Sequence, residues 1–382
     1  MVFCRRRKGW LILAKMFRVF LAALSLVACL FGLRPSAGLR RVTTSLPTGR
    51  DPFAVVVNPL TNKAYVANFS DSSVTVIDGA TNTTTDIPVG VHPGALAVNS
   101  LADKVYVANQ GDNTLTVIEG NTGRTTTLEV GKAPVAVAVN EATGMVYVAN
   151  QYSNDVTAIT AAGQATTIPA GKSPVAIAVN PATNQVYVAN LHSNDITVLD
   201  GAGNSVRTIR TGTSPSALAI DPVRSRVYVA NRGDSSVTII DPSGVTSTFA
   251  IKAQPVAVAV NPVNGRVYVA DALSDEVTVF DGSGLRAATI STGSTPLSLT
   301  VNPAANQLYV ANQGSNNVTL LEGDSNTLRS FSVGSSPRAL AVNPVTNKVY
   351  VANLRDGTVT IIDPAASNKT AHATRMIPAQ LP

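Results

Sequence analysis

Cysteine is almost absent from this 382-residue chain, and its two copies, Cys4 and Cys29, both fall within residues 1–38. The rest of the chain therefore has no disulfide framework and no thiol for catalysis. Trp10 is the only tryptophan, and charged residues make up only 14% of the sequence, whereas 45% is hydrophobic. A chain of this length can bury a large core, and its many Val, Thr, Asn and Ser residues favour β-structure with polar turns.

An excess of positive or negative charge is also lacking outside the N-terminal segment. The formal net charge is +6, but residues 1–38 hold seven basic residues and no acid, which leaves residues 39–382 at 6 − 7 = −1. Such a near-neutral body gives no general electrostatic reason to bind nucleic acid, so nucleic acid is not a favoured partner. The only three histidines are His92, His192 and His372. We therefore expect neither a metal site nor a cofactor.

Residues 1–38 are typical of an export signal. A basic cluster precedes the apolar run VFLAALSLVACLFGL at 19–33, which has the length and flanks of a secretory signal rather than of a membrane span. Ordinary cleavage near PSA at 35–37 is one interpretation. Two others are lipidation of Cys29, because LVAC at 26–29 fits a bacterial lipobox, and an uncleaved anchor. All three predict an exported protein, whether periplasmic, cell-surface or extracellular, that meets a membrane only through this leader or a lipid.

A repeat of 40 or 41 residues dominates the remainder of the chain. Each copy is built around the phrase YVAN or a close variant, and a proline stands thirteen residues before each tyrosine. The repeated tyrosines are Tyr65, Tyr106, Tyr147, Tyr187, Tyr228, Tyr268, Tyr309 and Tyr350. Eight copies with a period near 40 indicate a propeller or a solenoid.

One copy contains four short apolar runs separated by Asn, Asp, Gly and Pro. From residue 174 these runs are VAIAV, QVYVAN, ITVL and SVRTIRTG, the pattern of consecutive antiparallel hairpins. Four strands per repeat make one propeller blade. The sequence thus predicts an all-β β-propeller of four-stranded blades, each about 41 residues long, over residues 39–363, followed by a tail at 364–382.

These phrases make the chain similar to the YVTN family of β-propeller repeat proteins, with the motif here spelled YVAN. The resemblance implies an exported bacterial or archaeal protein, often at the cell surface and usually with seven blades. This sequence has eight complete units, so eight blades are favoured and seven are the alternative. The related-looking d1-haem domain of certain nitrite reductases indicates that eight blades are geometrically permissible.

Two segments compete to close the ring. Residues 40–52, RRVTTSLPTGRDP, have the register of a fourth strand but precede the first unit. Residues 372–378, HATRMIP, follow the last unit and match that register less well. We expect the N-terminal strand to complete the last blade, because this pairing would cover both exposed strand edges.

Residues that depart from the repeat are the candidates for function. In propellers of this type the fourth-to-first and second-to-third loops surround the channel on one face. We expect a monomeric, non-catalytic scaffold that presents this face to a protein, a polymer or an anionic ligand. The candidate ligand-binding residues are Lys132, Lys172, Arg232, Lys252, Arg338, Arg355, His192, Tyr152 and Asp271.

A propeller-type hydrolase or lyase is the alternative, similar to lactonases or streptogramin lyases, with a polar or metal site at the channel mouth. Asp271, which replaces the repeated Asn, and His192 would then be its central residues. The sequence contains no recognisable catalytic constellation, and we therefore favour a protein that is not an enzyme. The two readings differ in one respect: an enzyme needs His or acidic groups that converge within hydrogen-bonding distance.

Overall fold

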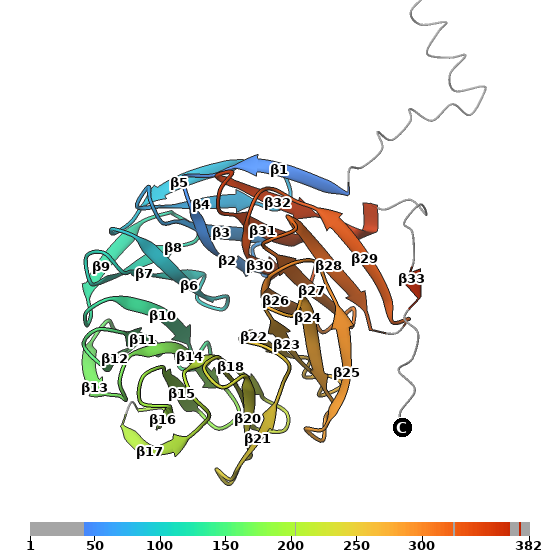
Figure 1. The fold of residues 1–382 in the computed structure, drawn as a ribbon. Coiled ribbons are helices and arrows are strands. Elements are labelled where there is room, and N and C mark those ends of the chain that lie inside the picture. The colour runs from blue at the N-terminus through green and yellow to red at the C-terminus, as the bar shows by residue number, and fades with distance from the viewer. Residues whose placement is uncertain (1–41, 203, 324, 367–373, 376–382) are drawn as a thin grey trace, which may run out of the picture.

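The computed structural model describes residues 42–366, except 203 and 324, and residues 374–375. The proposed leader at 1–38, with Cys29, lies outside the described residues. Eight sheets of antiparallel strands surround one axis (Figure 1), which confirms the predicted all-β, eight-bladed β-propeller. No helix in the described part of the chain is long and apolar enough to cross a membrane.

The first four blades follow one another in sequence, each with its first strand innermost. Blade 1 comprises β2 (Pro52–Asn58), β3 (Lys63–Asn68), β4 (Ser73–Asp78) and β5 (Thr84–Pro88). Blade 2 comprises β6 (Pro93–Asn99), β7 (Lys104–Asn109), β8 (Thr114–Glu119) and β9 (Thr125–Glu129). Blade 3 comprises β10 (Pro134–Val139), β11 (Val146–Asn150), β12 (Asp155–Ile159) and β13 (Ala165–Pro169). Blade 4 comprises β14 (Pro174–Asn180), β15 (Gln185–Asn190), β16 (Asp195–Leu199) and β17 (Ser205–Arg210).

The next three blades repeat this order. Blade 5 comprises β18 (Pro215–Asp221), β19 (Arg226–Asn231), β20 (Ser236–Ile240) and β21 (Thr246–Ala250). Blade 6 comprises β22 (Pro255–Val260), β23 (Val267–Asp271), β24 (Glu276–Phe280) and β25 (Arg286–Ser291). Blade 7 comprises β26 (Pro296–Asn302), β27 (Gln307–Asn312), β28 (Asn317–Glu322) and β29 (Thr327–Ser332).

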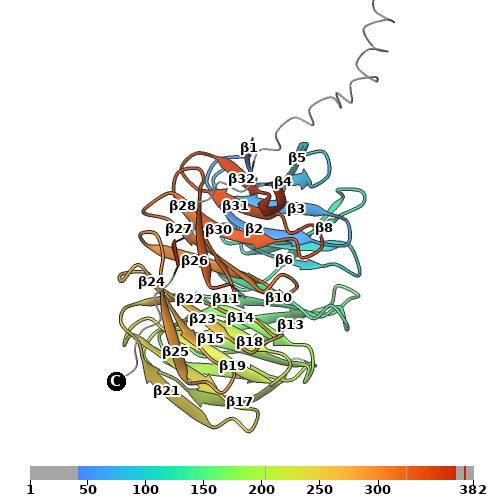
Figure 2. The ribbon, with the colours of Figure 1, turned by 90° about the vertical axis from the view of Figure 1, so that its right-hand side faces the viewer.

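Blade 8 is completed by the N-terminal strand. Its own strands are β30 (Pro337–Val342), β31 (Val349–Asn353) and β32 (Thr358–Ile362), followed by the short 3-10 helix η1 (Pro364–Ala366). The fourth strand is β1 (Thr43–Pro47), which pairs antiparallel with β32 from Thr43 opposite Ile362 to Pro47 opposite Thr358 (Figures 1 and 2). The N-terminal strand therefore closes the ring, as predicted.

The C-terminal segment lies elsewhere. Its two-residue strand β33 (Thr374–Arg375) pairs with β29 at the outer edge of blade 7, with Thr374 opposite Leu328. The alternative in which the tail supplies the closing strand is therefore wrong. The physical reason is that β1 already occupies the outer edge of blade 8, so no open strand edge is left there for a C-terminal strand.

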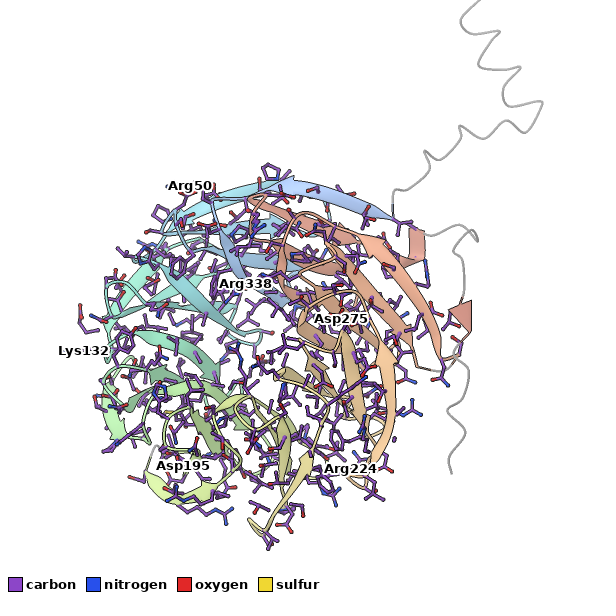
Figure 3. The ribbon with its side chains drawn as sticks, in the orientation of Figure 1. Arg50, Lys132, Asp195, Arg224, Asp275 and Arg338 are labelled. Carbon is purple, nitrogen blue, oxygen red and sulfur yellow. The ribbon has the colours of Figure 1, made fainter. Side chains whose placement is uncertain are left out.

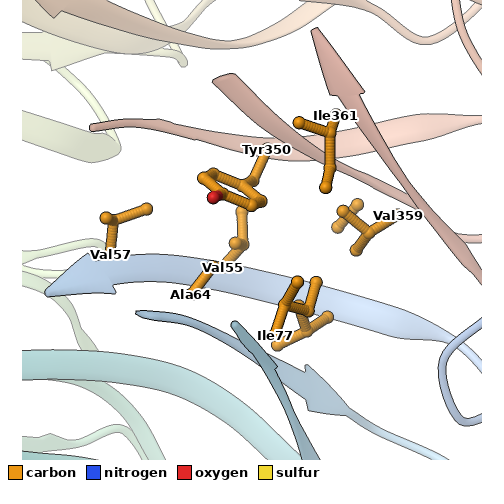
Figure 4. Packing of buried hydrophobic residues seen from close by; sticks show 9 residues of the cluster. Val55, Val57, Ala64, Ile77, Tyr350, Val359 and Ile361 are labelled. Carbon is orange, nitrogen blue, oxygen red and sulfur yellow. The ribbon is translucent and has the colours of Figure 1, made fainter. Parts of the chain in front are cut away.

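The hydrophobic core is divided into eight clusters, one at each interface between neighbouring blades. The repeated tyrosine of one blade packs in each cluster against the next blade, and all eight tyrosines are buried. At the closing interface Tyr350 of blade 8 packs with Val55, Val57 and Ile77 of blade 1 (Figure 4). The spacing of the tyrosines in the sequence therefore equals the number of residues between one blade interface and the next.

The tyrosine hydroxyls are less uniform than the rings. Tyr147 donates to the carbonyl oxygen of Gly201 at 2.9 Å, whereas the buried hydroxyls of Tyr65 and Tyr350 have no partner among the described residues. Burial raises the pKa of Tyr65 and of Tyr350 to about 12. The repeat therefore preserves the ring for packing rather than one fixed hydrogen bond.

The asparagine that ends YVAN is buried and fastens the second strand to the third. In blade 3, Asn150 Nδ2 donates to Asp155 Oδ1 at 2.7 Å and to Thr157 Oγ1 at 2.9 Å. These bonds join side chains of the second and third strands, so the asparagine fastens the two strands directly to each other. A glycine must lie above the asparagine, because a Cβ on Gly131 would be 2.6 Å from Asn150 Nδ2.

Candidate functional site

Two sets of loops form one face of the propeller, which we call the loop face: the fourth-to-first loops and the second-to-third loops. In blade 1 the Phe69 N–H donates to the carbonyl oxygen of Asp51 at 3.0 Å and so joins one loop of each set. Acidic side chains hold the same loops together: Asp71 Oδ2 accepts the Arg50 N–H at 2.6 Å, and Asp234 Oδ2 accepts that of Thr213 at 2.7 Å. These carboxylates also offset the basic residues of the face.

The six basic residues expected around the channel do not form one continuous cluster. Lys132, Lys172 and Arg355 are exposed and make no salt bridge within the described residues. Lys132 lies at the outer rim in Figure 3, whereas Arg338 lies beside the central opening. The remaining two, Arg232 and Lys252, lie near each other at blades 5 and 6 and are paired with neighbours there.

Tyr152 and His192 occupy equivalent positions in the second-to-third loops of blades 3 and 4. Both side chains are exposed, and both backbone N–H groups donate to a neighbouring loop carbonyl, those of Lys132 and Lys172 respectively, at 3.1 Å. Neither side chain makes a ring contact or a hydrogen bond within the described part of the molecule, so the structure gives them no partner that would define a site.

Arg338 belongs to a stack of planar groups at the channel mouth, which we call the Arg338 stack. Its Cζ atom lies 3.6 Å from the centroid of the Phe53 ring. The Phe53 ring stacks on Phe69, with centroids 5.2 Å apart and planes at 29°. Phe69 in turn stacks on His92 at 4.7 Å and 8°. One continuous stack thus runs from blade 8 across blade 1 to blade 2.

The backbone explains why these four groups meet. Arg338 and Phe53 each follow the repeated proline that begins an innermost strand, at a β-bulge that displaces this residue from the ladder. Arg338 is the only basic residue, and Phe53 the only aromatic one, in the eight innermost strands. Because blade 8 adjoins blade 1, ring closure places the two exceptions side by side. Phe53 and Phe69 were missed from the sequence because we searched mainly for polar loop residues.

Arg338 has no acidic partner within the described part of the chain, unlike Arg50, Arg224 and Arg329. Arg50 is 2.6 Å from Asp71, and Arg329, which also lies over a phenylalanine ring, is 3.4 Å from Glu322. Arg338 makes no salt bridge or side-chain hydrogen bond among the described residues. Partial burial lowers the pKa of its guanidinium, because desolvation disfavours the charged form and no acidic side chain among the described residues compensates for it.

A second departure from the repeat is the blade-6 corner, made of Lys252, Gln254, Asp271 and Glu276. Lys252 stands where the other blades have the glycine above the asparagine, and its Nζ is 3.0 Å from Glu276 Oε1. Gln254 accepts a hydrogen bond from Arg232 Nε at 3.4 Å. In the other seven blades the residue before the proline has a positive φ, which Gln254 does not have. This loop therefore follows a different path.

Asp271 is fully buried within this corner. Its Oδ2 accepts a hydrogen bond from Thr278 Oγ1 at 2.6 Å, while Oδ1 has no partner in the described residues. The unpartnered oxygen is not peculiar to blade 6, because the repeated asparagines have the same feature. What differs is the charge: burial raises the pKa of Asp271 to about 6, in spite of the Thr278 hydrogen bond.

No group of three or more His, Cys, Asp or Glu side chains that could hold a metal ion is present in the described ranges. The arrangement can thus offer an unpaired planar cation on aromatic rings at the mouth, and a buried carboxyl group of raised pKa at the blade-6 corner.

The comparisons with known proteins agree with the fold. The family described as "Lactonase, 7-bladed beta-propeller" matches residues 241–330, from the end of blade 5 through most of blade 7. This match spans well under half of the chain, and the chain has eight blades rather than seven. No curated protein matches the sequence.

Several solved structures are similar over most of their length. Hydrazine synthase from Kuenenia stuttgartiensis is 19% identical with a TM-score of 0.59, covering 87% of this chain and 99% of that one. A streptogramin B lyase is 12% identical with a TM-score of 0.58, covering 84% and 97%. Virginiamycin B lyase from Staphylococcus aureus is 14% identical with a TM-score of 0.58, covering 84% and 98%.

These similarities define the class of protein as a β-propeller, here with eight blades. At such low identity they concern the fold alone, since propellers carry many unrelated functions. Function must therefore be argued from the Arg338 stack and the blade-6 corner.

Proposed function

We propose that this chain is a non-catalytic, exported binding protein that holds an anionic ligand at the loop-face mouth of its channel. One observation carries the proposal: Arg338 is partly buried, stacked on Phe53, and without an acidic partner among the described residues. A desolvated cation that lacks a counter-charge is unfavourable. A bound carboxylate or phosphate would supply that charge through two parallel N–H···O bonds.

The export part of the proposal rests on the sequence. Residues 1–38 combine a basic cluster with an apolar run, as secretory signals do. The resemblance to the YVTN family supports an envelope location, because members of that family are typically exported. Cleavage by signal peptidase and lipidation of Cys29 are both compatible with the proposal.

A thermal-shift screen of the purified full chain tests the binding proposal. Small anions that bind only the folded state raise its midpoint by mass action, with about 2.7 kcal/mol of stabilisation at 100 times Kd. We expect at least one of phosphate, sulfate, citrate and benzoate to stabilise the wild type and the control R124A, but not R338A. Arg124 is the control because it is an exposed arginine in the turn between β8 and β9, which does not belong to the loop face. Equal stabilisation of all three proteins would refute the assignment of Arg338.

A hydrolase or lyase is the second candidate, supported by the lactonase match over blade 6 and by the raised pKa of Asp271. Full burial of Asp271 argues against it, because a catalytic carboxyl group must reach its substrate. Lactone hydrolysis that survives R338A but disappears in D271N would favour the enzyme.

A further inference from the structure

The face opposite the loop face carries the first-to-second and third-to-fourth turns of the blades, and we call it the hairpin face. Each first-to-second turn has a tip residue, two positions after the repeated Asn or Asp. All eight tips are exposed and aliphatic, and we call them the apolar ring: Leu60, Leu101, Ala142, Ala182, Val223, Val263, Ala304 and Val345. Because the tips occupy equivalent positions around one axis, they lie together at one end of the channel.

The geometry of the turn does not account for an aliphatic residue at its tip. The Leu60 N–H donates to Asn58 Oδ1 at 3.0 Å, and the Val345 N–H donates to Asn343 Oδ1 at 2.9 Å. Any residue with a backbone N–H can make this bond. The left-handed backbone of the turn falls at Asn62, whose φ is 55°, and not at the tip. Exposed turns ordinarily favour polar residues, so the shared aliphatic character points to an apolar surface beyond the turn.

Large exposed hydrophobic side chains are concentrated on the hairpin face. It carries seven of the ten that the described structure exposes, namely the five Leu and Val tips together with Val245 and Leu285 of the third-to-fourth turns. The other three, Val91, Tyr152 and Leu273, lie on the loop face. Hydrophobic residues that gather on one face mark an interaction surface, whereas residues scattered singly do not.

Side-chain hydrogen bonds hold neighbouring turns of the ring together. Asn343 Nδ2 of blade 8 donates to Asn62 Oδ1 of blade 1 at 2.9 Å. Asn58 Nδ2 of blade 1 in turn donates to Asp103 Oδ1 of blade 2 at 2.8 Å. The tips of blades 8, 1 and 2, each of them Leu or Val, therefore form one continuous arc. A level ring of apolar tips suits a flat partner rather than a small ligand.

The N-terminal part of the chain enters the propeller on this same face. β32 runs away from the loop face, and Thr43 of β1 pairs with Ile362 at its far end. The Asp363 N–H also donates to the carbonyl oxygen of Val42 at 2.8 Å. Residues 34–42 separate this point from the apolar run at 19–33, and nine residues span at most about 30 Å. A membrane that holds this run therefore adjoins the hairpin face.

We propose that the apolar ring rests on the surface of a lipid bilayer, so that the loop face and the Arg338 stack point away from the membrane. Aliphatic side chains at the boundary between headgroups and acyl chains gain from leaving water. Anchoring by one lipid chain is marginal and needs a second membrane contact, which the ring would supply if Cys29 is lipidated. The inference does not involve Arg338, so its failure would leave the proposed anion binding untouched.

Single-cysteine labelling of the full chain in vesicles tests the inference. Cys4 and Cys29 are the only cysteines, so C4S/C29S gives a cysteine-free background. L60C and V345C place the environment-sensitive fluorophore NBD on the apolar ring, and L273C places it on an exposed leucine of the loop face as the matched control. In phosphatidylcholine–phosphatidylglycerol vesicles we expect NBD emission at L60C and V345C to shift to the blue and to be quenched by nitroxide-labelled acyl chains. Neither effect is expected at L273C.

Three outcomes would overturn the inference, once an unchanged Tm has shown that each labelled variant is folded. Unshifted emission at all three positions would show that the ring does not touch the bilayer. Equal shifts at L60C and L273C would show that the propeller has no fixed orientation on the membrane. A blue shift at L60C that needs no vesicles and grows with protein concentration would show that a second copy of the chain covers the ring instead.

Discussion

Asp271 offers the sharpest test of the energetics of the repeat. Replacing it by asparagine restores the residue that the other seven blades use, and we expect D271N to be more stable than the wild type at neutral pH. The carboxyl group is fully buried and has a pKa of about 6, against an ordinary value of 3.8. A shift of about two pKa units corresponds to roughly 3 kcal/mol.

The direction of the pH dependence follows from linkage. Below pH 3.8 the carboxyl group is protonated in both the folded and the unfolded state, so it adds no pH dependence. Between 3.8 and about 6 the folded state holds a proton that the unfolded state has released, so the stability of the wild type falls as pH rises. Above about 6 the penalty is complete and constant. The advantage of D271N should therefore grow with pH and level off near neutrality.

Thermal unfolding between about pH 4 and pH 8 measures this difference. For a chain of this size 3 kcal/mol corresponds to an increase in Tm of about 4 °C for D271N at pH 8. The control D356N neutralises an exposed loop carboxylate that accepts the Ser335 N–H, a bond that an amide oxygen can also accept. Curves for D271N and the wild type that remain parallel across this pH range would refute the assignment of a buried, titrating carboxyl group.

Two further predictions concern closure and packing. Deleting residues 40–47 removes the ladder of β1 with β32 and the contact of Leu46 with the closing core, so it should lower Tm clearly. Removing 371–382 takes away, of the described structure, the two-residue strand β33 and should have little effect; the reverse order would show that the tail matters more. G131A should cost about 1–3 kcal/mol in urea unfolding, because its Cβ would lie 2.5 Å from Asp155 Oδ1, while G94A should be near neutral; equal stabilities would show that the loop relaxes freely.

Most of the fold could be predicted from the sequence because it is repeated eight times. The tyrosine spacing gave the number of interfaces, and the strand pattern of one unit applied to all others. The closing strand was predictable for the same reason, since residues 40–52 fit the register of a fourth strand. The detailed bonding of Asn150 was not, because a sequence pattern does not distinguish a backbone acceptor from a neighbouring threonine hydroxyl.

The candidate site was only partly predictable. Arg338 was among the residues that depart from the repeat, but its neighbour Phe53 was not considered, because the candidates were mainly polar loop residues. The two lie at opposite ends of the repeat array and meet only because the ring closes. A pattern of neighbouring residues in the sequence cannot predict a contact between residues so far apart. A position-by-position comparison of the eight innermost strands would have found both residues, since Phe53 is the only aromatic and Arg338 the only basic residue in these strands.

The location of the Arg338 stack also follows from how a repeated ring can acquire a function. A ring of near-identical blades presents the same surface eight times, and only an interruption of that symmetry can hold one ligand in one orientation. The interface between blades 8 and 1 already differs from the rest, because β1 reaches it from the other end of the chain. Departures at this interface leave seven repeated interfaces intact, each with its own buried tyrosine. Stability is thus distributed around the ring, while the unpaired cation and the Phe53 ring beneath it lie at one interface.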